Sequence, residues 1–141
     1  MELYKDQNVV LRYVDERKEL LQVWSGFVPA SLFRVIIDIS TEFIAKNDVD
    51  SLISDVTEQK VVSPEDAEYA ASALPEMMQY GLKVMAFVIP KDVFTRLSLK
   101  KFSDFGKDKP IGYFNSLPEA RQWIKVLLDT PVNKTSGNDL S

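Results

Sequence analysis

Apolar residues recur along the chain with two spacings, which alternate and predict strands and helices in turn. Segments dense in β-branched and aromatic residues, or with alternating apolar and polar positions, are expected to be strands. These are residues 8–14, 19–26, 49–57, 83–89 and 110–115, with a further short strand around Leu3. Segments with apolar residues at every third or fourth position are expected to be helices. These are residues 28–48, 64–80, 91–105 and 116–129.

The same pattern predicts which residues face the core. Residues 83–89 are almost continuously apolar up to Pro90, which is typical of a central strand buried on both faces. The inward residues of the first helix are predicted to be Leu32, Val35, Ile36, Ile39 and Phe43. Those of the second are Ala67, Ala70, Ala71, Leu74, Met77 and Met78, with a kink expected at Pro75 and a stop at Gly81. Those of the last helix are Leu117, Ala120, Trp123, Ile124, Leu127 and Leu128, with Ser116 as its cap.

The order of these elements predicts the fold class. The first two strands flank the polar segment 15–18, which has the length of a hairpin loop, and strands then alternate with helices. This order predicts an α/β domain with a mixed, mostly parallel sheet of about five strands, an N-terminal hairpin and about four helices. We expect one domain over residues 1–129. Residues 130–141 are polar without apolar periodicity, so a disordered tail is predicted.

Composition excludes several chemistries. The chain of 141 residues contains no cysteine and no histidine, so thiolate nucleophiles, cysteine metal sites and triads with a histidine base are excluded. No spacing singles out a catalytic pair of carboxylates. We therefore expect no enzymatic activity and no cofactor or metal, and an enzyme that uses carboxylate chemistry is the remaining alternative. The net charge of −4 argues against nucleic-acid binding. Without an apolar run long enough for a transmembrane segment or a signal peptide, a cytoplasmic location is expected.

Several local strings resemble a known family. They are VWSGFV (23–28), LISDV (52–56), VVSPED (61–66), GLKVMAFVIP (81–90), DVFTRLS (92–98) and YFNSLPEARQWI (113–124). Together they resemble the STAS-like domains of the bacterial anti-sigma-factor antagonist class, and in particular small stand-alone bacterial members with no assigned chemistry. The resemblance implies a STAS-like fold and a non-catalytic regulatory domain that binds a partner protein.

Ser63 has two interpretations. As a helix N-cap it accepts an N–H bond from the first turn, Pro64 occupies the first helical position, and Asp66 returns a bond to the cap. In the regulatory members that the chain resembles, a serine or threonine at this junction is phosphorylated, typically within Asp-Ser-Ser/Thr-Gly. Here Val62 replaces the aspartate and the glycine is missing. The cap is the favoured interpretation, so the usual phospho-switch motif is not expected.

The carboxyl ends of the parallel strands form the first candidate site. Ligands of open α/β sheets bind at this edge, where a predicted strand ends and a helix begins. The candidates for a protein contact or a phospho-switch are Asp55, Thr57, Ser63, Glu65 and Asp66. The alternative for Asp55, which we favour, is that it tethers a loop or caps a helix. A homodimer is also predicted, through an exposed hairpin edge or an apolar helix face.

The second candidate site is an aromatic and basic segment, residues 91–114. Residues 91–109 carry six lysines or arginines and three aspartates. An apolar pocket with cationic lips would suit a small apolar or anionic, lipid-like ligand. Its candidate residues are Phe94, Lys101, Phe102, Phe105 and Tyr113. The alternative is a helix with one core face and one solvated face. Stacking on single-stranded nucleic acid would need a similar composition, but the overall acidity argues against it.

Overall fold

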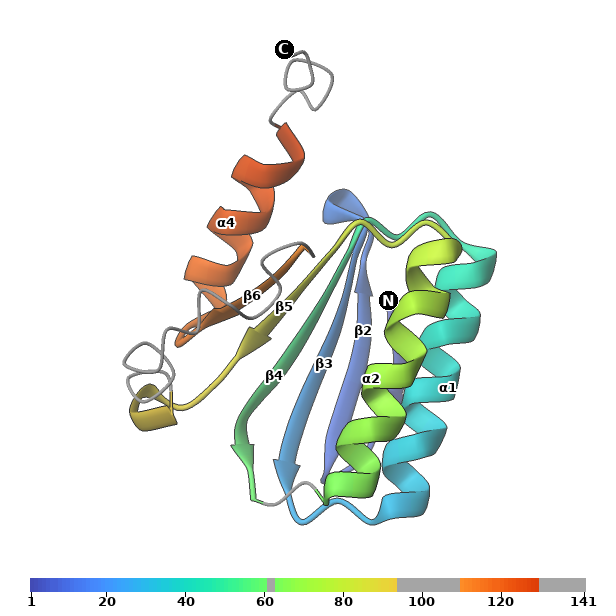
Figure 1. Cartoon of the computed structure of the whole chain (residues 1–141), viewed down its shortest axis with the longest axis vertical. Helices are drawn as coiled ribbons and strands as arrows, with labels where there is room; N and C mark the ends of the chain where they lie inside the picture. The colour runs from blue at the N-terminus through green and yellow to red at the C-terminus, as the bar shows by residue number, and fades with distance from the viewer. Residues whose placement is uncertain (61–62, 94–109, 130–141) are drawn as a thin grey trace.

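A six-stranded sheet forms the centre of the molecule (Figure 1). The computed structural model describes residues 1–60, 63–93 and 110–129. The strands lie side by side in the order of the chain: β1 (Glu2–Lys5), β2 (Val9–Val14), β3 (Glu19–Gly26), β4 (Ser51–Gln59), β5 (Val84–Val88) and β6 (Ile111–Phe114). The pairings β1–β2 and β2–β3 are antiparallel, and the other three are parallel. The predicted fold class is confirmed, with six strands instead of about five.

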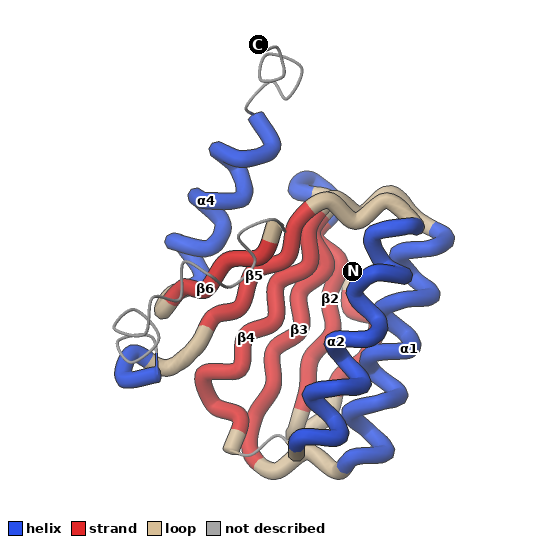
Figure 2. Tube along the Cα trace, viewed as in Figure 1, coloured by secondary structure: helices blue, strands red, loops and turns tan. Residues whose placement is uncertain are grey.

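Helices cover both faces of the sheet. α1 (Ala30–Lys46) and α2 (Pro64–Gln79) lie together on one face, whereas α4 (Leu117–Asp129) lies on the opposite face against β4, β5 and β6 (Figures 1 and 2). α1 connects β3 to β4 and α2 connects β4 to β5, so both connections cross the sheet in the same direction. Because such connections between parallel strands are right-handed, the two helices lie on the same face of the sheet. A 3-10 turn, Asp15–Arg17, closes the β2–β3 hairpin.

Two of the sequence predictions concern segments that are only partly described. Of the helix predicted at 91–105, residues 91–93 are helical, and the remainder lies outside the described residues, as does the tail predicted at 130–141.

α2 continues through Pro75 as one helix, and Gly81 follows it with a positive φ of 115°. Within the described part of the chain, no helix is both long and apolar enough to cross a membrane.

Alternation along the strands divides the buried residues between two cores. Leu20, Trp24 and Leu52 point towards α1 and α2. Leu21 and Ile53, each one residue further along, point towards α4. This division follows from the two-residue period of a strand. The sheet is therefore the wall that separates the two apolar clusters.

The buried stripe of α1 differs from the predicted one. Its buried residues are Phe33, Ile36, Ile37, Ser40 and Ile44, whereas Val35 is 46% exposed. The prediction was right for Ile36, which is buried, and the predicted Leu32, Ile39 and Phe43 are half-buried against the core. It was wrong for Val35, and it missed buried residues next to predicted ones, because the buried face of the helix is turned by about one residue from the predicted stripe. Ser40 is buried because its hydroxyl donates to the carbonyl of Ile36 at 2.8 Å and accepts from Nε2 of Gln22 at 3.0 Å. A polar residue whose hydrogen bonds are made is compatible with the core.

An ion pair joins α4 to the sheet. Arg121 donates from Nη2 to Glu19 Oε2 at 2.7 Å and from Nε to Glu19 Oε1 at 3.0 Å. The Glu19 side chain is only 2% exposed and that of Arg121 is 26% exposed. The hydrogen bonds to Glu19 raise the pKa of the Arg121 guanidinium. The ion pair between Arg121 and Glu19 therefore lies at one end of the apolar contact between α4 and the sheet.

Aromatic packing fixes the same helix at its first turns. The rings of Trp123 and Phe114 lie 5.2 Å apart, over Gly112. A β-carbon at position 112 would come within 2.8 Å of the Phe114 ring, so the close approach requires glycine. Leu127, predicted to point inward, is 38% exposed, because Leu128 makes the buried contacts in the last turn.

Candidate functional site

A cavity of about 290 Å³ lies between α2 and the sheet. Its floor is formed by inward side chains of β3 to β6, which include Leu52, Met85, Phe87 and Ile111. β5 was predicted to be buried on both faces, and this holds only towards α4. Val84, Ala86 and Val88 are buried, but Met85 and Phe87 are half-buried because they border the cavity.

The apolar stripe of α2 packs only in part against the core and also lines the cavity. Ala67 and Ala71 are exposed, Ala70 and Leu74 are half-buried, and all four line the cavity. Of the predicted stripe, only Met77 is buried. The physical reason is the size of these side chains, since three alanines on one helix face leave space above the strands. The prediction identified the correct face of the helix but not the cavity beneath it.

Buried polar side chains are set into the cavity floor. Trp24 Nε1 donates to Ser54 Oγ at 3.2 Å, and Gln22 Nε2 donates to Ser40 Oγ on α1 at 3.0 Å. Gln22 and Ser54 are 1% and 5% exposed. Such bonds are strong in a medium of low dielectric constant and hold their side chains in place. Sequence reasoning missed both residues, although each stands between apolar residues at inward strand positions.

Gln59, the last residue of β4, contributes the unusual feature of the site. Its side chain lines the cavity, and its Oε1 atom is buried without a hydrogen-bond partner. It is the only buried side-chain oxygen or nitrogen in this condition among the described residues. Leaving such an acceptor unsatisfied costs about 1–3 kcal/mol.

Tyr113 closes the cavity on the β6 side. Its ring stacks on Phe87, with ring centroids 5.3 Å apart and planes inclined by 12°. Burial raises the pKa of the Tyr113 phenol. Of the predicted pocket residues, Tyr113 does line a pocket. The other four, Phe94, Lys101, Phe102 and Phe105, lie outside the described residues.

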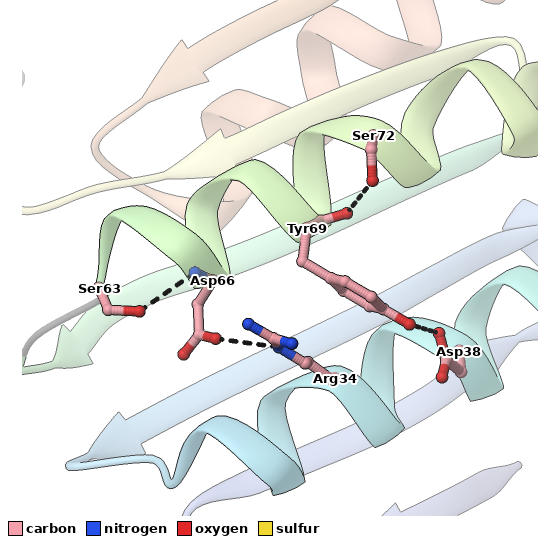
Figure 3. Close-up of polar contacts among 6 residues, drawn as sticks. All are labelled: Arg34, Asp38, Ser63, Asp66, Tyr69 and Ser72. Carbon is pink, nitrogen blue, oxygen red and sulfur yellow. Dashed lines mark hydrogen bonds and ion pairs between the residues drawn. The ribbon is translucent and has the colours of Figure 1, made fainter.

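Ser63 is the N-cap of α2, as predicted. Its Oγ accepts from the backbone N–H of Asp66 at 3.1 Å (Figure 3). The carboxylate of Asp66 was expected to return a bond to the cap; it instead accepts from Arg34 Nε of α1 at 3.4 Å. Glu65 is exposed in the first turn of α2. Ser63 and Asp66 thus have structural roles in starting α2 and joining it to α1.

The contact between the two helices continues from Arg34. Its guanidinium lies over the ring of Tyr69, 5.1 Å from the centroid, and the Tyr69 hydroxyl donates to Asp38 (Figure 3). This bond to Asp38 raises the pKa of Tyr69. The Ser72 hydroxyl donates to the backbone carbonyl of Tyr69 at 2.8 Å. These groups therefore make their hydrogen bonds and ring contacts with one another along the outer side of the helix pair.

Asp55 and Thr57 interact within β4. Asp55 Oδ1 accepts from the backbone N–H of Thr57 at 3.0 Å and from its hydroxyl at 2.7 Å. Both residues belong to the strand, so this contact is neither the loop tether nor the helix cap that was the favoured alternative for Asp55. Val56 points into the cavity, so Asp55 points to the opposite face of the sheet. α2 starts at Ser63 on the cavity face, and the structure therefore does not bring Asp55 and Ser63 together as one site.

Comparison with known proteins gives no relative. No protein-family model matches the chain, and no curated protein is similar enough to count as a match. The described residues also contain no group of three or more acidic side chains placed to hold a metal ion.

Proposed function

We propose that this protein is a non-catalytic binding protein whose ligand is a small, mainly apolar molecule held in the cavity between α2 and the sheet. The observation that carries the proposal is the cavity itself. Ligand sites are concave and lined mainly by apolar side chains, and this cavity opens to solvent beside the exposed Ala67 and Ala71. A volume of about 290 Å³ is roughly ten times the ~30 Å³ that each water occupies in the liquid.

The lining supports an apolar ligand. The face of α2 that borders the cavity includes Ala67, Ala70, Ala71 and Leu74, two of which are exposed although they lie on the apolar face of the helix. Apolar surface removed from water contributes about 25 cal/mol per Å². A ligand between α2 and β5 would bury apolar surface on both walls. This is the lipid-like alternative of the sequence analysis, with Tyr113 in common and otherwise with other residues.

The chain carries its own probes for this test. Of its four methionines, Met77 and Met85 line the cavity, whereas Met1 and Met78 do not. We expect titration with n-butylbenzene to shift the methyl NMR signals of Met77 and Met85 saturably and to leave those of Met1 and Met78 in place. Unchanged Met77 and Met85 signals at the solubility limit of the probe would refute the proposal.

A matched pair of variants tests the location. Ala70→Phe places a ring in the cavity and should abolish the shifts of Met77 and Met85. Glu68→Phe places the same ring on an exposed position of α2 that does not line the cavity, and binding should persist. Equal loss of binding in both variants would indicate that the effect comes from α2 as a whole and not from the cavity.

A protein contact at the strand ends is a second candidate, and one observation favours it. Phe27, between β3 and α1, is 71% exposed. The loop is held in one conformation by Asn8, whose Nδ2 donates to the carbonyls of Ser25 at 2.9 Å and Phe27 at 3.2 Å. A rigid exposed aromatic side chain is a typical anchor of a protein interface. We propose this contact as the regulatory role in the cytoplasm that the resemblance to STAS-like domains implies.

The second candidate has its own test. Phe27→Ala should abolish capture of a partner protein from the native host without changing the midpoint of urea unfolding. Ser63→Asp, which keeps an acceptor at the cap, should leave capture unchanged, since no phospho-switch is proposed. Light scattering would test the predicted homodimer at the same time. A partner captured equally by the protein and by Phe27→Ala would contradict the anchor role.

A further inference from the structure

We infer that the cavity selects a ligand with a flat aromatic ring, which stacks on Phe87 and extends the row of rings that Tyr113 and Phe87 begin. This inference rests on the proposed ligand-binding function and adds the chemical class of the ligand. It follows from the orientation of the Phe87 ring, from the short side chain next to it on β4, and from the small side chains of α2 on the opposite wall.

The Phe87 ring has one face turned towards β4. Phe87 and Tyr113 are cross-strand neighbours on β5 and β6, with ring centroids 5.3 Å apart and planes inclined by 12°. Nearly parallel rings at this distance overlap face to face with an offset, which is a favoured aromatic geometry. Because Tyr113 covers the face on the β6 side, the other face of the Phe87 ring is on the β4 side. Phe87 is half-buried and lines the cavity.

The next position in the same cross-strand row is a serine. Ser54 of β4 is the neighbour of Phe87, and it also lines the cavity. Its hydroxyl accepts from Nε1 of Trp24 at 3.2 Å, and a side chain of this length does not cover an aromatic ring beside it. Neighbouring strands are about 4.8 Å apart, within the roughly 4.5–7 Å that separates the centroids of interacting rings. A ligand ring above Ser54 would therefore lie at stacking distance from Phe87.

The opposite wall leaves room for a flat ring. α2 presents Ala67, Ala70 and Ala71 to the cavity, and alanine has the smallest side chain with a β-carbon. Met77 and Met85 line the same cavity, and a thioether sulfur makes favourable contacts with aromatic rings. An aliphatic chain, as in the lipid-like ligand of the sequence analysis, would bury apolar surface but gain neither the stacking nor the sulfur contacts. The described lining thus favours an aromatic ligand.

Two compounds with the same skeleton test the inference. 2-Phenylethanol and 2-cyclohexylethanol differ only in the ring, and the hydroxyl that they share contributes equally to both. The cyclohexyl ring has the larger apolar surface, so burial of apolar area alone would favour 2-cyclohexylethanol. Stacking acts in the opposite direction. We expect 2-phenylethanol to bind about fivefold more tightly, measured from the saturable shifts of the Met77 and Met85 methyl signals.

Matched substitutions locate the preference. Phe87→Leu keeps an apolar side chain at the cavity but removes the ring, so the preference for 2-phenylethanol should disappear while 2-cyclohexylethanol still binds. Phe33→Leu makes the same change at a lining residue whose ring packs on Trp24, so the preference should persist. If one of them fails to fold, Phe87→Ile, which suits a strand, or Phe33→Met, which suits a helix, takes its place.

The outcomes separate the inference from the function on which it rests. If neither compound shifts Met77 and Met85, the proposed ligand-binding function is wrong. If both bind and 2-cyclohexylethanol binds as tightly or more tightly, the cavity is a ligand site but the selection of an aromatic ring is wrong. If Phe87→Leu keeps the preference, or if Phe33→Leu loses it to the same extent, Phe87 is not the stacking partner.

Discussion

The pair between Arg121 and Glu19 permits a quantitative prediction about how α4 is held. Replacing Arg121 by methionine leaves the Glu19 carboxylate, 2% exposed, without the two hydrogen bonds of 2.7 and 3.0 Å that it accepts. Removing one partner of a buried pair typically costs about 3–5 kcal/mol. This is a large part of the roughly 5–15 kcal/mol that stabilises a domain. At a urea slope of about 2 kcal/mol per M, the midpoint of unfolding should fall by about 2 M.

Two further variants define the mechanism. The double variant Glu19→Met with Arg121→Met should recover most of the loss, because an apolar pair of similar volume avoids the cost of desolvating two charges. Lys125→Met on the same helix removes a pair with Asp129 in which both side chains are 68% exposed, and it should change stability by less than about 0.5 kcal/mol. A loss in Arg121→Met no larger than that in Lys125→Met would refute the reasoning, as would a double variant less stable than either single variant.

Three other substitutions have defined outcomes. Ser63→Ala should lower the free energy of unfolding by about 1 kcal/mol in urea, because the cap of α2 is lost, and Ser63→Asp should lose less. Gly112→Ala should cost about 1–3 kcal/mol in thermal unfolding, since the added carbon would lie 2.8 Å from the Phe114 ring. Burial raises the pKa of Tyr113, so the folded chain keeps this proton after the unfolded chain has lost it, and stability should fall as pH rises above about 10. Tyr113→Phe should show a smaller alkaline fall, and equal falls would contradict the assignment.

Periodicity was sufficient to predict the elements and their order. The hairpin, the alternation of strands and helices, and the cap at Ser63 all follow from residues that are close in sequence, and the structure confirms them. Such features depend on backbone geometry that neighbouring residues determine.

Features that depend on packing between elements could not be predicted in this way. Glu19 and Arg121 are 102 residues apart, and nothing in the local pattern of either residue indicates the other. The cavity depends on how far α2 stands from β5, which the apolar pattern of either element does not specify. Gln59 was not singled out in the sequence, and that its oxygen is buried without a partner depends on the residues packed around it in the fold.

The strand order has a consequence for how the chain folds during synthesis. Each strand from β2 onward pairs with the strand synthesised immediately before it. Each of these strands can therefore form its first hydrogen-bonded pairing before the next strand has been synthesised. Contacts between elements that are near in sequence close short loops, which costs less chain entropy and speeds folding. The sheet therefore suits assembly in the direction of translation, from the N-terminal hairpin to β6. α4, made last of the described elements, then covers the side of Ile53 and Ala86 that earlier segments leave open.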